Sequence, residues 1–101
     1  MFGFLNKVRY AVRSPKWPEI RKAHLKENNT CAVCGRIKGL EVHHIKPVHL
    51  FPDLELDPNN LITLCADTCH LAFGHLFNFK SWNKDVENDA KKFNYKVKYR
   101  P

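Results

Sequence analysis

Two closely spaced pairs of cysteines constrain this chain more than any other feature of its sequence. Two residues separate Cys31 from Cys34, and three separate Cys65 from Cys69. Four thiolates can hold one tetrahedral zinc ion, and such a closed site is structural because no coordination position is left for a substrate. Gly35 follows the first pair and permits the tight turn of a zinc knuckle. The sequence therefore predicts a structural Zn²⁺ bound by all four cysteines, with ordinary buried thiols or a redox-active pair as alternatives.

The length and charge of the chain agree with a small metal-stapled domain. Its 101 residues can bury one modest core, and cores of that size often need a metal or disulfides. Lysine and arginine number 17 against 10 for aspartate and glutamate, a net charge of +7. This excess favours a polyanionic partner, DNA or RNA first, although a basic surface can also serve solubility alone.

The N-terminal residues contain no apolar run long enough for a signal peptide or a membrane span. We therefore expect a cytoplasmic protein with no membrane partner. Thiols stay reduced in that compartment, and paired cysteines there usually hold metal rather than form disulfides.

Hydrophobic spacing and turn residues predict helices around a short strand pair. The expected elements are, in chain order, a basic arm at residues 1–16, a helix from Pro18 to about Asn28, strands at 40–45 and 61–64, a helix from Thr68 to about Phe73 that Gly74 caps, and a basic amphipathic helix at 84–101 packed on the same domain.

A second set of residues lies between and just after the cysteine pairs: His43, His44, Asn60 and His70. In this order, framed by the two pairs, they resemble the His-Asn-His (HNH) endonucleases of the ββα-metal fold. The resemblance covers roughly residues 17–83, and residues 73–83 are similar to a phage-borne branch of that family. It implies an α+β fold: a small ββα-metal (treble-clef-like) domain with a structural zinc knuckle, flanked by an N-terminal and a C-terminal helix.

The resemblance also implies a chemistry, the metal-dependent hydrolysis of DNA phosphodiester bonds. His44 would be the general base, since a neutral imidazole is suited to accept a proton near neutral pH. His43 and His70 would bind one divalent ion (Mg²⁺, Mn²⁺, Ni²⁺ or Zn²⁺) that keeps positions open for phosphate and water. Asn60 would hold the loop that carries His44, although Asn59 could take that role instead.

Two geometric questions follow from these assignments. In a regular strand His43 and His44 point to opposite faces, so both line one site only if the strand ends or bulges there; otherwise base and ligand could be exchanged. His75 follows His70 by five residues, which places them about 140° apart on a continuous α-helix. We expect His75 to be a third metal ligand if Gly74 breaks the helix, and a surface or DNA-facing residue if it does not.

Basic side chains that flank the site are expected to neutralise phosphates without reading bases. These are Arg21, Lys22, Arg36, Lys38, Lys46 and Lys80. The resemblance further implies a phage or prophage protein, a monomer or weak dimer, with a possible place beside terminase and other DNA-packaging proteins. The main alternative is a zinc-stapled DNA-binding or adaptor protein without catalysis, and a third reading is a Cys-x-x-Cys thiol oxidoreductase.

Overall fold

The computed structural model describes residues 14–78 and 80–99 of the chain. Most of the basic arm expected at residues 1–16 therefore lies outside the described residues. The last two residues of the C-terminal helix expected at 84–101 lie outside them as well. Among the described residues, no helix is both long enough and apolar enough to cross a membrane.

A two-stranded antiparallel sheet lies at the centre of the fold. Strand β1 (Leu40–His44) pairs with β2 (Leu61–Cys65), and Val42 lies opposite Thr63 in the register. Every residue of β2 is buried, as expected for a strand that is covered on both faces. The sheet provides the rigid element from which the histidines of β1 project.

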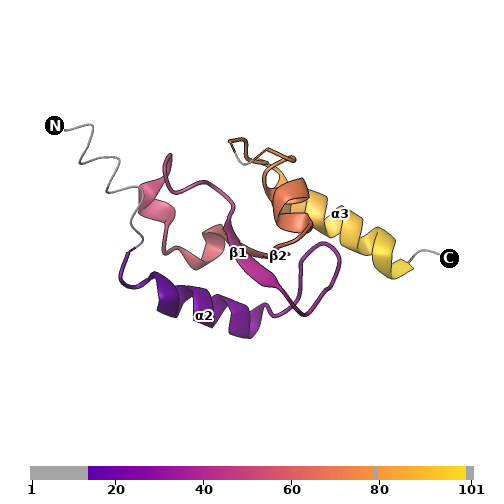
Figure 1. Cartoon of the computed structure of the whole chain (residues 1–101), viewed down its shortest axis with the longest axis horizontal. Coiled ribbons are helices and arrows are strands. Elements are labelled where there is room, and N and C mark those ends of the chain that lie inside the picture. Colours follow the sequence, from indigo (N-terminus) through magenta and orange to yellow (C-terminus); the bar gives the residue numbers. More distant parts are fainter. Residues whose placement is uncertain (1–13, 79, 100–101) are drawn as a thin grey trace.

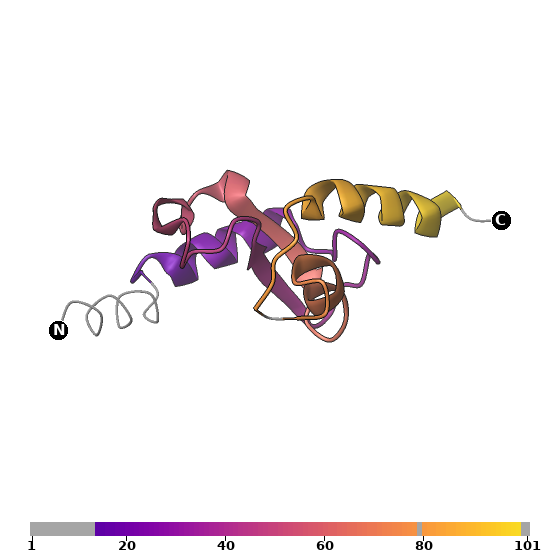
Figure 2. The same cartoon turned by 90° about the horizontal axis from the view of Figure 1, so that it is seen from above.

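Helices cover the sheet from two sides. Helix α2 (Trp17–Glu27) precedes the sheet, and the helical turn η3 (His70–Gly74) and helix α3 (Val86–Tyr99) follow it. Figures 1 and 2 show α2 and η3 on different sides of the two strands. This arrangement confirms the predicted small α+β fold with an N-terminal and a C-terminal flanking helix.

Local sequence signals explain where α2 begins and ends. Pro18 stands in the first turn, where its missing N–H costs nothing and its fixed φ suits the helix. Asn28 ends the helix, and both its backbone N–H (2.8 Å) and its side-chain amide (3.1 Å) donate to the carbonyl of His24. The helix faces the sheet with a half-buried stripe that includes Trp17.

The zinc knuckle predicted around the first cysteine pair is a tight turn in the structure. Gly35 has a φ of 79°, which residues with a side chain avoid, and its N–H donates to the carbonyl of Cys31 at 2.9 Å. The N–H of Ala32 donates to the carbonyl of Thr63 at 2.9 Å, which joins the knuckle to β2. Val33 of the knuckle is fully buried in the core.

Helix α3 is attached to the domain by its first turns. Val86 and Ala90 are buried, whereas Tyr95 and Tyr99 are exposed. The side-chain amide of Asn94 donates to a carbonyl of the knuckle at 3.0 Å. The expected basic amphipathic helix is therefore present, and its residues from Val86 to Asn94 contact the domain.

Candidate metal centres

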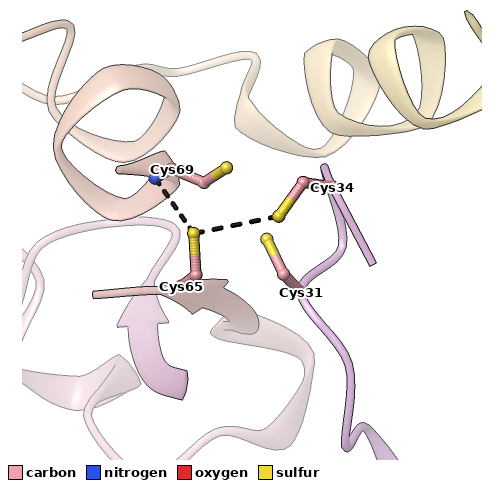
Figure 3. A group of neighbouring side chains, drawn as sticks. All are labelled: Cys31, Cys34, Cys65 and Cys69. Carbon is pink, nitrogen blue, oxygen red and sulfur yellow. Dashed lines mark hydrogen bonds between the residues drawn. The ribbon is translucent and has the colours of Figure 1, made fainter. Parts of the chain in front are cut away.

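The four cysteines converge on one point. Their sulfur atoms all lie within 4.8 Å of one another, and no disulfide joins any of them. The Sγ atoms of Cys34 and Cys65 are 3.9 Å apart (Figure 3). Four sulfurs bound at about 2.3 Å to one tetrahedral zinc ion lie about 3.8 Å from each other. The cluster therefore has the dimensions of a structural zinc site.

The electrostatics of the cluster also favour a cation. Burial raises the pKa of Cys34 and of Cys69, and Coulomb repulsion from Cys31 adds to the increase. Burial opposes ionisation of Cys65 too, but hydrogen bonds, first that from the N–H of Cys69 (3.3 Å), lower its pKa to about 7. Four thiolates this close need a positive ion among them, and the residues present fit zinc.

Three histidines form a second cluster beside the first. His43 projects from β1, His70 begins η3 and His75 directly follows it. The His70 Nε2 atom lies 3.0 Å from His43 Nδ1 and 3.2 Å from His75 Nε2. Three nitrogens bound to one ion at about 2.0–2.1 Å are separated by about 2.9–3.4 Å. The spacing of the three rings thus fits one shared divalent cation.

Neighbouring acceptors set the tautomers of two of these rings. The Nδ1 of His70 donates to the Oε2 of Glu41 at 2.8 Å, and the Nδ1 of His75 donates to the carbonyl of Ser81, also at 2.8 Å. A carboxylate and a carbonyl only accept, so the hydrogen of each neutral ring lies on Nδ1. Both Nε2 lone pairs therefore face the centre of the cluster, as metal ligands require.

Two rings of the cluster, those of His43 and His70, favour the neutral state that binds metal. Burial, followed by Coulomb repulsion from His70, His75 and His44, lowers the pKa of His43 from 6.5 to about 3. Burial also lowers the pKa of His70, although its bond with Glu41 acts in the opposite direction. A cation binding near neutral pH would not have to displace a proton from either ring.

A π-helical turn explains how His75 reaches the cluster. In such a turn the backbone hydrogen bonds join residues five apart, which brings these residues close together along one side of the helix. An α-helix instead separates them by about 140°. The helix expected from Thr68 to about Phe73 is therefore present, but as a π-helical turn at His70–Gly74 and not as an α-helix. Gly74 is not the C-terminal cap that the sequence predicts: it lies within the turn, and His75 caps it. π-Helical turns of this kind are frequent at functional sites.

Gly74 is needed for space rather than for an unusual φ. A β-carbon at this position would lie 3.0 Å from the Cε1 and 3.1 Å from both ring nitrogens of His43. The His43 ring is only 4% exposed and lies directly against this backbone. The absence of a side chain at Gly74 therefore allows β1 and η3 to approach closely enough to share a ligand set.

His44 lies on the other face of β1, as strand alternation predicts. Its ring centroid is 4.6 Å from that of Trp17 on α2, and its Nε2 lies 2.9 Å from the carbonyl oxygen of Glu55. Because a carbonyl only accepts, the hydrogen lies on Nε2 and the lone pair on Nδ1 when this ring is neutral. His43, not His44, joins the three-histidine cluster.

Asn60 fixes the backbone that surrounds His44. It is buried, its Oδ1 accepts the N–H of Lys46 at 2.8 Å, and its Nδ2 donates to the carbonyls of Lys46 (3.0 Å) and Leu54 (3.2 Å). Leu54 directly precedes Glu55, whose carbonyl contacts His44. Asn59, the alternative considered for this role, is exposed, and its N–H donates to the Oδ1 of Asp57 at 2.9 Å.

All six basic residues expected to contact DNA are exposed. The guanidinium of Arg36 lies 3.6 Å from the carboxylate of Asp67. The ammonium of Lys46 lies 5.5 Å from the centroid of the Phe51 ring. Arg36 and Lys46 thus each have a neighbour that positions the side chain, while the charge remains at the surface.

The structure adds Glu41 and Ser81 to the residues singled out in the sequence. Glu41 precedes His43 by two positions, so strand alternation could have placed both on the same face of β1. Ser81 acts through its backbone carbonyl, for which the sequence carries no signal. Asn83, whose Nδ2 donates to the carbonyl of Phe73, is a buried polar side chain that composition alone does not reveal.

The fold and the two clusters define a small α+β metal-binding domain with adjacent cysteine and histidine sites. The family model described as HNH endonuclease matches residues 31–75, which contain both clusters. This segment therefore matches the HNH endonuclease family, and its four cysteines fit the zinc-stapled type. Comparisons with curated proteins and with solved structures found no match. The HNH domain supports a nuclease-like function that involves DNA binding.

Proposed function

We propose that this protein is an HNH endonuclease that hydrolyses phosphodiester bonds in DNA with the help of a divalent cation. One observation carries the proposal: the nitrogens of three histidines face one another at the spacing of a shared ligand set, inside the segment that matches the HNH family. A protein that only bound DNA would need the cysteine cluster but not this second one.

In the proposed site His43, His70 and His75 hold the cation through one nitrogen each. When bound, such an ion supplies positive charge for the phosphate and for the leaving oxygen. Three protein ligands leave coordination positions open for the substrate. Glu41 and the Ser81 carbonyl keep two of the rings in the required tautomer.

His44 is the proposed general base. Its Nε2 donates to the carbonyl of Glu55, so the lone pair that would accept a proton from the attacking water is on Nδ1. His44 is the last residue of β1. Beyond it the side chains no longer alternate between the two faces of the strand. Asn60 would fix this arrangement by holding both Lys46 and Leu54. Catalysis by His44 thus requires the scissile phosphate to reach the end of the strand.

The six exposed cations would bind the DNA backbone, consistent with the net charge of +7. The likeness of residues 73–83 to phage-borne HNH proteins supports a further proposal: the protein comes from a phage or prophage. It would then work in the host cytoplasm beside DNA-packaging proteins, as a monomer or weak dimer.

The test is the nicking of supercoiled plasmid DNA by zinc-loaded protein in Mg²⁺, Mn²⁺ or Ni²⁺, with a chelated control. His44→Ala should lower the cleavage rate by about 10²- to 10⁴-fold, the contribution typical of a general base, with zinc content and DNA affinity unchanged. His49→Ala is the matched control because His49 is an exposed loop histidine, and it should cleave normally.

Three outcomes would contradict parts of this proposal. Normal cleavage by His44→Ala would refute the assignment of the base. DNA binding without cleavage in any of the metals would identify a non-catalytic adaptor. Purified protein without zinc but with disulfide reductase activity would favour the thiol oxidoreductase.

A further inference from the structure

The chain reverses direction directly after the cation site, and the reversal uses strained backbone. Leu76 and Phe77 have φ values of 53° and 64°, in the left-handed region that residues with a side chain rarely adopt. Both side chains are exposed, so their packing does not stabilise the turn. Backbone bonds of the turn, such as that from the N–H of Phe77 to the carbonyl of Leu71 at 2.9 Å, keep the reversal closed together with contacts made by the following segment.

Asn83 makes contacts of that kind. It is 7% exposed, its backbone N–H donates to the carbonyl of Gly74 at 3.0 Å, and its Nδ2 donates to the carbonyl of Phe73 at 2.9 Å. These carbonyls stand at the C-terminal end of η3, where a helix leaves its carbonyls without partners of its own. Asn83 therefore closes the end of the turn that begins with His70.

Two residues earlier, the same segment contacts a proposed ligand. The carbonyl of Ser81 accepts the Nδ1 hydrogen of His75 at 2.8 Å, while the Nε2 of His75 faces that of His70. We call residues 81–83 the strap. Because the strap is short, the bonds that Asn83 makes with η3 set the position of the Ser81 carbonyl.

Helix α3 fixes the strap from its other side. The Nδ2 of Asn83 also donates to Asp89 at 2.8 Å, and its Oδ1 accepts the N–H of Asp85 at 3.0 Å. The rings of Phe73 on η3 and Phe93 on α3 pack with their centroids 5.2 Å apart. One buried side chain thus joins the turn that carries the histidines to the helix that follows.

We propose that the strap positions His75 as the third ligand of the cation site, with Asn83 as the positioning residue that acts through the Ser81 carbonyl. The inference rests on the proposed cation site and extends it beyond residue 75, where the family match ends. Without the strap, His70 keeps its orientation because Glu41 holds it. His75 loses the acceptor that orients its ring, and the site falls from three ligands to two.

The test is the affinity of zinc-loaded protein for Ni²⁺ or Mn²⁺, measured by calorimetry. Asn83→Asp keeps the side-chain size but removes the Nδ2 donor and places a carboxylate beside Asp89. Affinity should fall by about 10- to 100-fold, the loss typical when a metal ligand loses its outer hydrogen-bonding partner, with zinc content unchanged. Asn94→Asp is the matched control, since Asn94 joins α3 to Val33 of the knuckle instead of to η3, and it should bind normally.

A double-mutant cycle with His75→Ala separates positioning from general destabilisation. If Asn83 acts through His75, Asn83→Asp should cost little further affinity in the His75→Ala background. An equal loss in both backgrounds would overturn the proposal. If His75→Ala alone leaves affinity unchanged, the cation site itself is misassigned; if it weakens binding and Asn83→Asp does not, only the strap fails.

A second measurement uses the unchanged protein and so does not depend on a variant folding. Nitrogen–proton NMR spectra of the zinc-loaded chain should show His75 as the Nδ1–H tautomer, with that hydrogen in slow exchange with water. An Nε2–H tautomer, or rapid exchange at Nδ1, would overturn the role of the Ser81 carbonyl.

Discussion

Gly74→Ala should weaken cation binding much more than it lowers the stability of the fold. The added methyl would lie 3.0–3.1 Å from three atoms of the buried His43 ring. Overpacking of this kind costs about 1–3 kcal/mol, whereas Ala is favoured over Gly in a helix by about 1 kcal/mol. The free energy of unfolding should therefore fall by only about 0–2 kcal/mol.

The cation site should suffer much more than the fold. The ring can relieve the contact only by moving away from η3, which carries it away from His70, now 3.0 Å distant. Ligand distances in metal sites are held within about 0.2 Å, so a shift of a few tenths of an ångström exceeds that tolerance. We expect at least a tenfold loss of Ni²⁺ or Mn²⁺ affinity, which is about 1.4 kcal/mol, and a matching loss of plasmid nicking.

Gly39→Ala is the control with the opposite pattern. Gly39 has a φ of 63° and open space around its missing side chain. Its substitution should lower the free energy of unfolding by about 1–2 kcal/mol through backbone strain and leave cation affinity unchanged. Calorimetric titration and thermal denaturation of both variants provide the comparison. Wild-type cation affinity in Gly74→Ala would refute the close-approach argument.

Three further predictions concern the same two clusters. Glu41→Gln should weaken cation binding by about 10- to 100-fold, because it no longer holds the tautomer of His70; unchanged affinity in a titration would contradict this. Removal of zinc with a strong chelator should unfold the chain, as seen in the circular dichroism spectrum, since four buried thiols lose their common ion; a retained native spectrum would argue against a structural zinc. Because folding lowers the pKa of His43 to about 3, the unfolded chain binds a proton at this ring between about pH 6.5 and 3 that the folded chain does not. The free energy of unfolding should therefore be unaffected above pH 6.5 and decline as the pH falls toward 3, by up to about 1.4 kcal/mol per pH unit. Denaturant unfolding from pH 7.5 to 5 should show this slope, and His43→Gln should lose it.

The fold was predictable because strong local signals and the cysteine spacing agree. Pro18 and Asn28 bracket the first helix as their chemistry requires, and the glycine after Cys34 forms the expected left-handed turn. The cysteine pairs then leave few ways to connect a knuckle, two strands and a helix around one ion. Helices and strands were therefore expected within a few residues of where they lie.

The π-helical turn could not be predicted from the sequence. On an α-helix the spacing of His70 and His75 places them on different faces, and no residue between them signals an i→i+5 pattern. The turn depends on contacts from distant residues: the ring of His43 against Gly74, and the bonds of Asn83 to the final carbonyls. Tertiary contacts thus decide the one local geometry on which the proposed third ligand depends.

The order of residues at the start of η3 connects the two metal centres. Cys69 caps the turn, and His70 is the next residue, so one peptide bond separates a proposed zinc ligand from a proposed ligand of the second cation. The N–H of Cys69 donates to Cys65 at the end of β2, which fixes the direction in which η3 leaves the sheet. A zinc ion at the cysteines would therefore set the position from which His70 reaches His43. For this reason loss of zinc should abolish cation binding at the histidines, even in a variant that is stable enough to keep its helices without zinc.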